Sequence, residues 1–263
     1  MRCGRQRAQN RPCAPRRAGA RGAGWSEEAW FRGVSLDWSR LHLQMLFVDC
    51  CANGLPSRLA EALMRRVADW NGAAWLLFTD SAGLDAVRDA PAGSSVSSVP
   101  ALCSVGHRFG LDSRYFTRGS NRFSDPLDFH LHDLILSCSS EDSAHADLKA
   151  LAFESSDKAE GAVLPLSHFA HYLSDADLLE TEKGSAPLPE DLARWLGSED
   201  RLPRARDAGF ELPAVTAETL ASDEGQRKCN LWMASAVVSI AGMTRFLLDT
   251  CPVEMLERKY FPD

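Results

Sequence analysis

The sequence predicts an α/β fold in which a four-stranded parallel sheet is flanked by helices on both faces. Short apolar runs alternate with amphipathic segments between residues 41 and 153. This alternation is typical of parallel strands joined by right-handed helical crossovers. The first apolar run also ends in a turn of small and polar residues that leads directly into a helix start. That layout predicts a phosphate-binding loop after the first strand.

The first strand and the helix after it have the clearest pattern. Residues 41–48 form an apolar run with the length of a buried strand. Pro56 suits the first turn of a helix, where its missing N–H does no harm to the helix itself. Apolar residues then recur at helical spacing, at Leu59, Ala60, Leu63, Met64, Val67 and Trp70. We therefore expect an amphipathic helix over residues 56–70.

The later segments continue the alternation. We expect a second strand over residues 74–79, closed by a turn of sequence Asp80-Ser81-Ala82-Gly83. A short helix follows over residues 101–109. A helical turn then leads into a third strand that ends at Leu136, and residues 141–153 are expected to be helical.

The last part of the chain differs in composition. Residues 154–222 are acidic, punctuated by prolines and weakly periodic, which indicates an insert with one helical patch from Pro189 to Leu196. Residues 230–250 then form a strongly apolar helix that Pro252 ends. No run approaches the ~18 apolar residues that a membrane span needs, so we expect no span.

Composition and charge limit the class of protein. The chain has 263 residues, 45% of them hydrophobic, which is enough for one core with extensions. The net charge of −7 hides an asymmetry, because residues 1–25 hold seven arginines and no acidic residue. This leader lacks the apolar segment of a secretory signal and suits either an organellar transit segment or a disordered tail. The acidic remainder argues against a nucleic-acid partner.

Cysteine usage points to a compartment. The eight cysteines show neither Cys-x-x-Cys spacing nor an alternating Cys/His pattern. Reduced thiols in an intracellular compartment are therefore expected. That compartment is the cytoplasm, or a plastid or mitochondrion if the leader is a transit segment.

The turn after the first strand carries the chemistry of the chain. It has the sequence Leu46-Phe47-Val48-Asp49-Cys50-Cys51-Ala52-Asn53-Gly54-Leu55-Pro56-Ser57-Arg58, and Ala60-Glu61-Ala62 follows shortly after. It resembles the signature of the low-molecular-weight protein-tyrosine phosphatases. In that family a strand ending Leu-Phe-Val runs into Cys-x-Gly-Asn-x-Cys-Arg-Ser-Pro, and a helix opening Ile-Ala-Glu-Ala comes next.

Four other stretches resemble the same family in order and spacing. They are Asp80-Ser81-Ala82-Gly83, a segment that begins at Arg114, Asp128-Phe129 with Asp133-Leu134-Ile135-Leu136, and Phe246-Leu247-Leu248 in the last helix. The resemblance implies a phosphatase-like domain over residues 41–251 that contains the 154–222 insert. Residues 26–40 would be an N-terminal extension and residues 252–263 a tail.

The resemblance also implies roles for individual residues. In the family a cysteine thiolate attacks phosphorus, loop N–H groups and an arginine hold the phosphate, and a remote aspartic acid protonates the leaving group. Counting back from Ala60-Glu61-Ala62 puts Cys50 at the nucleophile position, whereas counting forward from Leu46-Phe47-Val48 puts Asp49 there. The loop therefore carries an insertion. The residues implied are Cys50 or Cys51 as nucleophile, Arg58 as clamp, Asp223 as acid, and Ala52, Asn53, Gly54, Leu55 and Ser57 as the phosphate-binding loop.

Two hypotheses stay open. The first is an enzyme that hydrolyses phosphotyrosine in a protein, or a small phosphate monoester, through a cysteinyl-phosphate intermediate that needs no metal or organic cofactor. The second is a catalytically impaired domain that serves binding or scaffolding. Pro56 stands at the position of the clamping arginine and removes an N–H donor from the loop. Asp49 would raise the pKa of a neighbouring thiol and repel a phosphate dianion.

Overall fold

A five-stranded parallel sheet lies at the centre of the protein. The computed structural model describes residues 36, 42–50, 55–84, 99–116, 121–124, 127–138, 146–155, 163–182, 184–207 and 219–251. The strands are β1 (Leu43–Asp49), β2 (Leu77–Gly83), β3 (Asn121–Arg122), β4 (Leu134–Ser137) and β5 (Val163–Pro165). They are ordered β3-β2-β1-β4-β5, and every pair is parallel. The predicted α/β class is confirmed, with five strands instead of four because short strands extend both edges.

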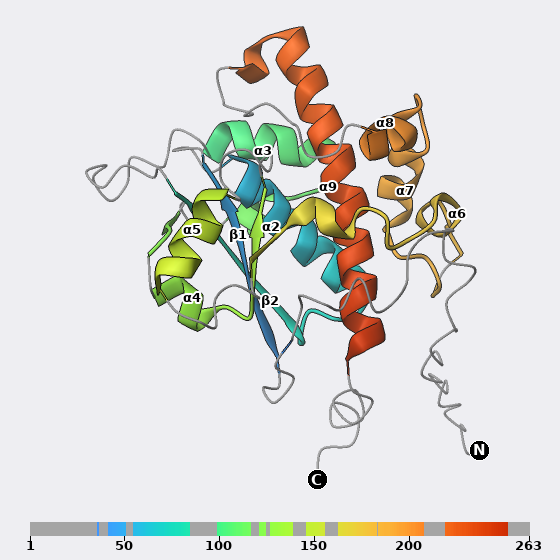
Figure 1. Ribbon diagram of the computed structural model, residues 1–263. Helices are drawn as coiled ribbons and strands as arrows, with labels where there is room; N and C mark the ends of the chain where they lie inside the picture. Colours follow the sequence, from blue (N-terminus) through green and yellow to red (C-terminus); the bar gives the residue numbers. More distant parts are fainter. Residues whose placement is uncertain are drawn as a thin grey trace, which may run out of the picture.

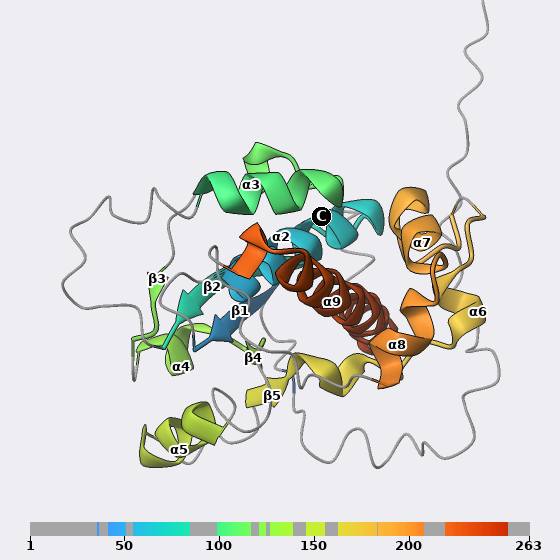
Figure 2. The ribbon, with the colours of Figure 1, turned by 90° about the horizontal axis from the view of Figure 1, so that it is seen from above.

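Helices cover both faces of this sheet, as predicted (Figures 1 and 2). The α-helices are α2 (Leu55–Trp70), α3 (Val99–Arg108), α4 (Leu127–Leu131), α5 (Ala146–Ser155), α6 (Asp175–Leu178), α7 (Glu190–Leu196), α8 (Arg201–Asp207) and α9 (Asp223–Thr250). Among the described residues, three 3₁₀ turns accompany them: η2 (Ser113–Phe116), η4 (Leu166–Phe169) and η5 (Thr219–Ala221).

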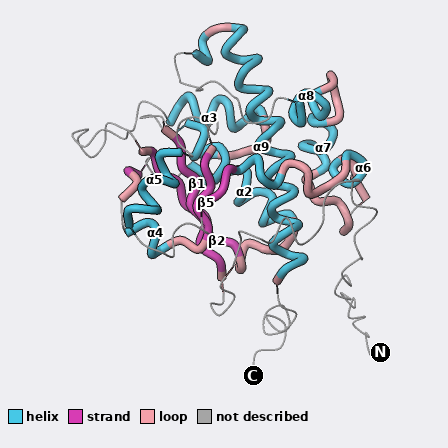
Figure 3. Tube along the Cα trace, in the orientation of Figure 1, coloured by secondary structure: helices cyan, strands magenta, loops and turns pink. Residues whose placement is uncertain are grey.

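The two faces bury separate apolar clusters. The larger cluster lies between the sheet and α2, α3 and α9, and the smaller one lies under α4 and α5. Along β1, Met45 and Phe47 belong to the larger cluster, whereas Leu46 and Val48 belong to the smaller one. This is the alternation of a strand buried on both sides. Figure 3 shows the strands in magenta enclosed by the cyan helices.

The second strand differs from its predicted bounds. Asp80–Gly83 was expected to be a turn, but these residues form the second half of β2 and pair with Leu46–Asp49 of β1. The polar side chains suggested a turn, but the Ser81 hydroxyl is buried and donates a hydrogen bond to Glu61 of α2, at 2.6 Å. A buried polar strand residue is tolerated when it has such a partner.

Helix α9 is the longest of the described elements and lies against α2, α8, η4 and η5. By length and composition it meets the criterion for a membrane span, since an 18-residue window has a mean hydropathy of 1.6. One such helix is weak evidence for a span, and the sequence-based expectation of no span remains a prediction. Moreover, 83% of that window is buried inside the protein, which is typical of a core helix.

The acidic segment 154–222 contributes to the same structure. β5 pairs with β4 at the sheet edge, and the predicted helical patch is confirmed as α7. α7 is joined to α2 by an ion pair between Asp191 and Arg66, at 2.7 Å. The segment therefore supplies a strand to the sheet and helices to one of its covering layers.

Candidate functional site

The candidate site lies at the carboxyl end of β1. Asp49 ends the strand and Leu55 begins α2, so the intervening loop lies at the sheet edge where ligands of parallel α/β proteins bind. Cys50 follows β1 directly and is half-buried. Cys51, Ala52, Asn53 and Gly54 lie outside the described residues, so their roles remain predictions.

Asp49 is the most informative residue of this site. Its position on β1 places it on the same face as Met45 and Phe47, under α2, and its exposed fraction is 0%. The backbone N–H of Ser57, in the first turn of α2, donates to Asp49 Oδ2 at 2.7 Å. A carboxylate at this place is stabilised by the positive end of the helix dipole. The first turn of α2 thus already binds an anion, and that anion belongs to the chain itself.

The other residues of this turn add few donors. Leu55 and Pro56 are buried, and Pro56 has no N–H to offer. The Ser57 N–H is already used by Asp49. Of the predicted phosphate-binding residues that the structure describes, Leu55 is part of the apolar core and Ser57 contacts the Asp49 carboxylate.

Arg58, the predicted clamp, is held inside the protein. Its exposed fraction is 3%, although an arginine at a helix surface would ordinarily reach solvent. Burial lowers the pKa of its guanidinium, while electrostatic interactions with Glu61 and with Cys103 of α3 act in the opposite direction. Arg58 therefore lies within electrostatic range of α3 as well as of its own helix.

A polar network fixes the first half of α2 to β2. Glu61 accepts a hydrogen bond from Ser81 at 2.6 Å and forms an ion pair with Arg65 at 2.5 Å. Arg65 also donates hydrogen bonds to the hydroxyl and carbonyl oxygens of Thr79, at 3.1 and 3.0 Å. Burial raises the pKa of Glu61, while Ser81 and Arg65 oppose the shift.

The two ends of this network were visible in the sequence only as separate motifs. Ala60-Glu61-Ala62 and Asp80-Ser81-Ala82-Gly83 both carry the family resemblance, and the structure shows that they meet through Glu61 and Ser81. No spacing rule within either motif predicts this contact, because it depends on how α2 crosses β2.

Asp223, the predicted general acid, lies apart from the loop residues. It is the first residue of α9, is exposed, and follows Ser222, whose hydroxyl accepts the Gly225 N–H at 3.0 Å. Trp232, nine residues further on, donates to the carbonyl of Cys138 beyond β4 at 3.2 Å. Asp223 is thus about 14 Å along the helix axis from the point where α9 meets the sheet end. Within the described ranges, no hydrogen bond or ion pair joins Asp223 to Cys50 or Arg58.

Comparison with known proteins supports the fold. No family model matches the sequence, and no curated protein sequence matches it. A protein tyrosine phosphatase from Entamoeba histolytica, solved with Hepes in its active site, is 14% identical, with a TM-score of 0.50 over 79% of this chain and 97% of that chain. YfkJ from Bacillus subtilis is 15% identical and matches 79% of this chain and 96% of its own, with a TM-score of 0.47.

A low-molecular-weight protein tyrosine phosphatase from T. tengcongensis is 21% identical over 58% of this chain and 88% of its own, with a TM-score of 0.37. At these identities a structural similarity establishes a shared fold alone. The Entamoeba structure, with a TM-score of 0.50, is the evidence for that fold. The chain therefore has the α/β fold of the low-molecular-weight protein tyrosine phosphatases, as the sequence resemblance implied.

Proposed function

We propose that this chain is a phosphatase-fold protein that does not turn over phosphate monoesters efficiently and serves instead as a binding or scaffold domain. The observation that carries the proposal is the buried Asp49 carboxylate, which accepts the Ser57 N–H at the start of α2. In this fold that position is where a phosphate oxyanion would be expected to bind.

The magnitudes favour exclusion of a phosphate. Two like unit charges about 4 Å apart repel by about 4 kcal/mol at the effective dielectric constant of a protein surface. A helix N-terminus stabilises an anion by about 0.3–1 kcal/mol, and by up to about 2 kcal/mol in partly buried geometry. The repulsion between Asp49 and a phosphate dianion would therefore exceed the stabilisation that the helix dipole of α2 provides.

A second function is favoured by Cys50 and Arg58. Cys50 lies half-buried at the carboxyl end of β1, and Arg58 is held inside near the start of α2 instead of in solvent. Such a thiolate would attack phosphorus, the ester oxygen would leave with a proton from an acid, and water would then cleave the cysteinyl phosphate. Phosphotyrosine in a protein or a small phosphate monoester would be the substrate.

Hydrolysis of p-nitrophenyl phosphate by the full chain separates the two functions. The proteins compared are the wild type, Cys50→Ser, Cys51→Ser and Arg58→Ala, each checked by circular dichroism for native secondary structure. We expect the wild type to show no more turnover than the variants. Turnover that is abolished by one cysteine substitution and by Arg58→Ala would overturn the proposal and identify the nucleophile.

Calorimetric titration with inorganic phosphate tests the role of Asp49 directly. We expect no phosphate binding by the wild type and measurable binding by Asp49→Asn, which keeps the shape and an acceptor for the Ser57 N–H but removes the charge. Equal phosphate binding by both proteins would contradict the assignment of Asp49 as the excluding group.

A further inference from the structure

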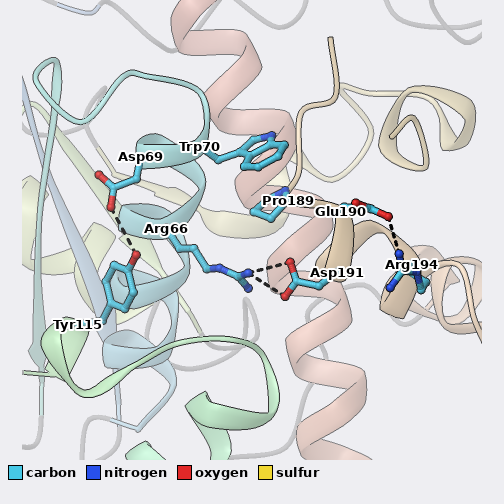
Figure 4. Close-up of a pocket in the computed structure, with 8 residues that line it drawn as sticks. All are labelled: Arg66, Asp69, Trp70, Tyr115, Pro189, Glu190, Asp191 and Arg194. Carbon is cyan, nitrogen blue, oxygen red and sulfur yellow. Dashed lines mark hydrogen bonds and ion pairs between the residues drawn. The ribbon is translucent and has the colours of Figure 1, made fainter. Parts of the chain in front are cut away.

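Two cavities adjoin each other near the C-terminal end of α2, away from the β1–α2 loop. The first has a volume of about 550 Å³ and lies between α2, η2 and α7 (Figure 4). The second, about 560 Å³, lies against the first half of β2. Asp69 and Tyr115 line both cavities. The two therefore form one tandem groove, with Asp69 and Tyr115 at its centre.

The cations of the tandem groove are all neutralised by neighbours. Arg66 forms two hydrogen bonds of 2.7 Å with Asp191, and Figure 4 shows this pair together with that of Arg194 and Glu190. In the second cavity Arg65 is paired with Glu61. None of these arginines is available to attract an acidic ligand.

Asp69 is the carboxylate that these pairs leave uncompensated. The residue is exposed, and the only hydrogen bond to its carboxylate within the described ranges is a long one of 3.4 Å from the Tyr115 hydroxyl. No arginine, lysine or histidine of the described segments forms an ion pair with it. The centre of the tandem groove therefore carries a net negative charge that suits a cationic ligand group.

An exposed aromatic ring lies on each side of Asp69. Trp70 is 43% exposed, and its Nε1 donates to the Ala186 carbonyl at 3.0 Å, which holds the indole in place. Phe78 is 51% exposed, and its ring centroid lies 4.8 Å from that of His42. An ordered aromatic side chain binds an apolar or cationic group with little loss of its own conformational entropy.

The second cavity is also bordered by an open strand edge. β3 pairs only with Ala82 and Gly83 of β2, so no described strand lies beside residues 77–80 on that side. The Thr79 carbonyl at this edge accepts a hydrogen bond from Arg65 at 3.0 Å. An extended chain lying along such an edge presents successive side chains to opposite sides.

We propose that the tandem groove binds an extended peptide in which a basic residue has an apolar residue two positions away on each side, so that all three side chains point the same way. The basic side chain would pair with Asp69 beside the indole of Trp70, and the apolar ones would pack on Trp70 and Phe78. The inference does not depend on the proposed function, because Asp69 lies 14 residues after Leu55, or about 21 Å along α2 from the loop.

The test measures fluorescence polarisation of a labelled peptide, Gly-Val-Thr-Arg-Thr-Val-Gly, against the full chain. A second peptide carries citrulline in place of arginine, which keeps the shape and removes the charge. We expect the citrulline peptide to bind about fivefold more weakly, as one exposed ion pair with a cation–π contact would give. Asp69→Asn should weaken the arginine peptide by a similar factor.

The matched control is Asp147→Asn, which removes an exposed carboxylate on α5, on the opposite face of the sheet. It should leave both affinities unchanged. Asp69→Arg should reverse the preference, so that a peptide with glutamate in place of arginine binds more tightly than the arginine peptide. Equal affinities for arginine and citrulline peptides, an Asp69→Asn protein that binds as the wild type does, or no binding at about 1 mM protein would each overturn the proposal.

Discussion

Asp49 is the single residue on which the interpretation of the site depends. The sequence showed that a carboxylate adjoins the thiols, and from this we expected a raised thiol pKa and repulsion of phosphate. The structure adds that this carboxylate is buried and hydrogen-bonded to Ser57. A cap of this kind could not be predicted from spacing alone, since the loop between Asp49 and α2 determines whether the side chain turns toward the helix.

Removal of the Asp49 carboxylate should destabilise the protein. Asp49→Ala leaves the Ser57 N–H without its charged acceptor in a buried place, so we expect a loss of about 2 kcal/mol in the free energy of unfolding, measured in urea. Asp223→Ala is the matched control, because Asp223 also begins a helix but is exposed, and its removal should cost less than about 1 kcal/mol. Equal losses would mean that Asp49 is stabilised by no more than the helix dipole.

Glu61 should make stability depend on pH. Its pKa in the folded protein is raised above the ordinary value of 4.5, mainly by burial. A raised carboxyl pKa contributes stability below the unfolded pKa, and this contribution is lost as the pH rises through the folded pKa. The wild type should therefore lose stability relative to Glu61→Gln as the pH rises above the ordinary pKa of 4.5 and through the raised pKa of the folded protein. A difference that is constant with pH would show that Glu61 does not titrate in this range.

The buried thiols should be unreactive in the native protein. Burial raises the pKa of Cys229 and of Cys251 to about 11, and it raises the pKa of Cys138 well above the ordinary value with a further contribution from Asp49. At about pH 8 a thiol with a pKa near 11 is ionised to about one part in a thousand. Iodoacetamide should label the half-buried Cys50 and Cys103 before these three, and mass spectrometry should find the three buried thiols labelled only in urea. Early labelling of Cys138 would contradict its burial.

At the scale of elements, the helices were predicted with uneven accuracy, since the last helix was expected over residues 230–250 but α9 begins at Asp223. α2 and α7 fall within one residue of their expected bounds because their apolar spacing or their flanking prolines mark both ends. The second strand was predicted to end too early, at residue 79, because Asp80 and Ser81 are polar. β5 was not predicted because it has only three residues. Short strands are defined by the neighbour they pair with, and no local pattern of a single sequence contains that information.

Helix α9 offers two substitutions with opposite expected effects. A Cβ at Gly242 would lie 2.2 Å from the Phe169 carbonyl oxygen of η4, so Gly242→Ala must push two backbones apart. We expect it to lower the free energy of unfolding by about 2 kcal/mol or more, although alanine is the better helix former. Ser239→Ala, on the same helix, removes a buried hydroxyl that has no hydrogen-bond partner among the described residues, and should stabilise by about 1 kcal/mol. Thermal unfolding of both variants in one buffer decides the signs.

At the scale of the whole molecule, the question is whether residues 154–222 are a separate insert or part of one cooperative fold. The sequence favoured an insert, because acidic and proline-rich segments lack the apolar periodicity of core elements. The structure places β5 in the sheet, and Leu188, Leu192 and Leu196 around α7 in the large apolar cluster that also contains α2 and α9. Shared burial of this kind couples segments that are distant in sequence, which favours a single unfolding transition.

Leu192→Ala tests this coupling. Leu192 lies on α7 with an exposed fraction of 1%, and truncation of such a leucine costs about 2–5 kcal/mol through lost burial and the cavity left behind. If α7 belongs to the cooperative fold, far-ultraviolet circular dichroism and the fluorescence of Trp232 in α9 should report one shared urea midpoint, lowered by the substitution. Separating the Trp232 signal requires the other six tryptophans to be replaced by phenylalanine in both proteins compared. A Trp232 midpoint that stays constant while the circular dichroism loses an early fraction of its signal would mean that the segment unfolds alone. In that case the ion pair of Arg66 with Asp191 would be too weak to couple the segment to the rest of the fold, because an exposed pair contributes only about 0–1 kcal/mol.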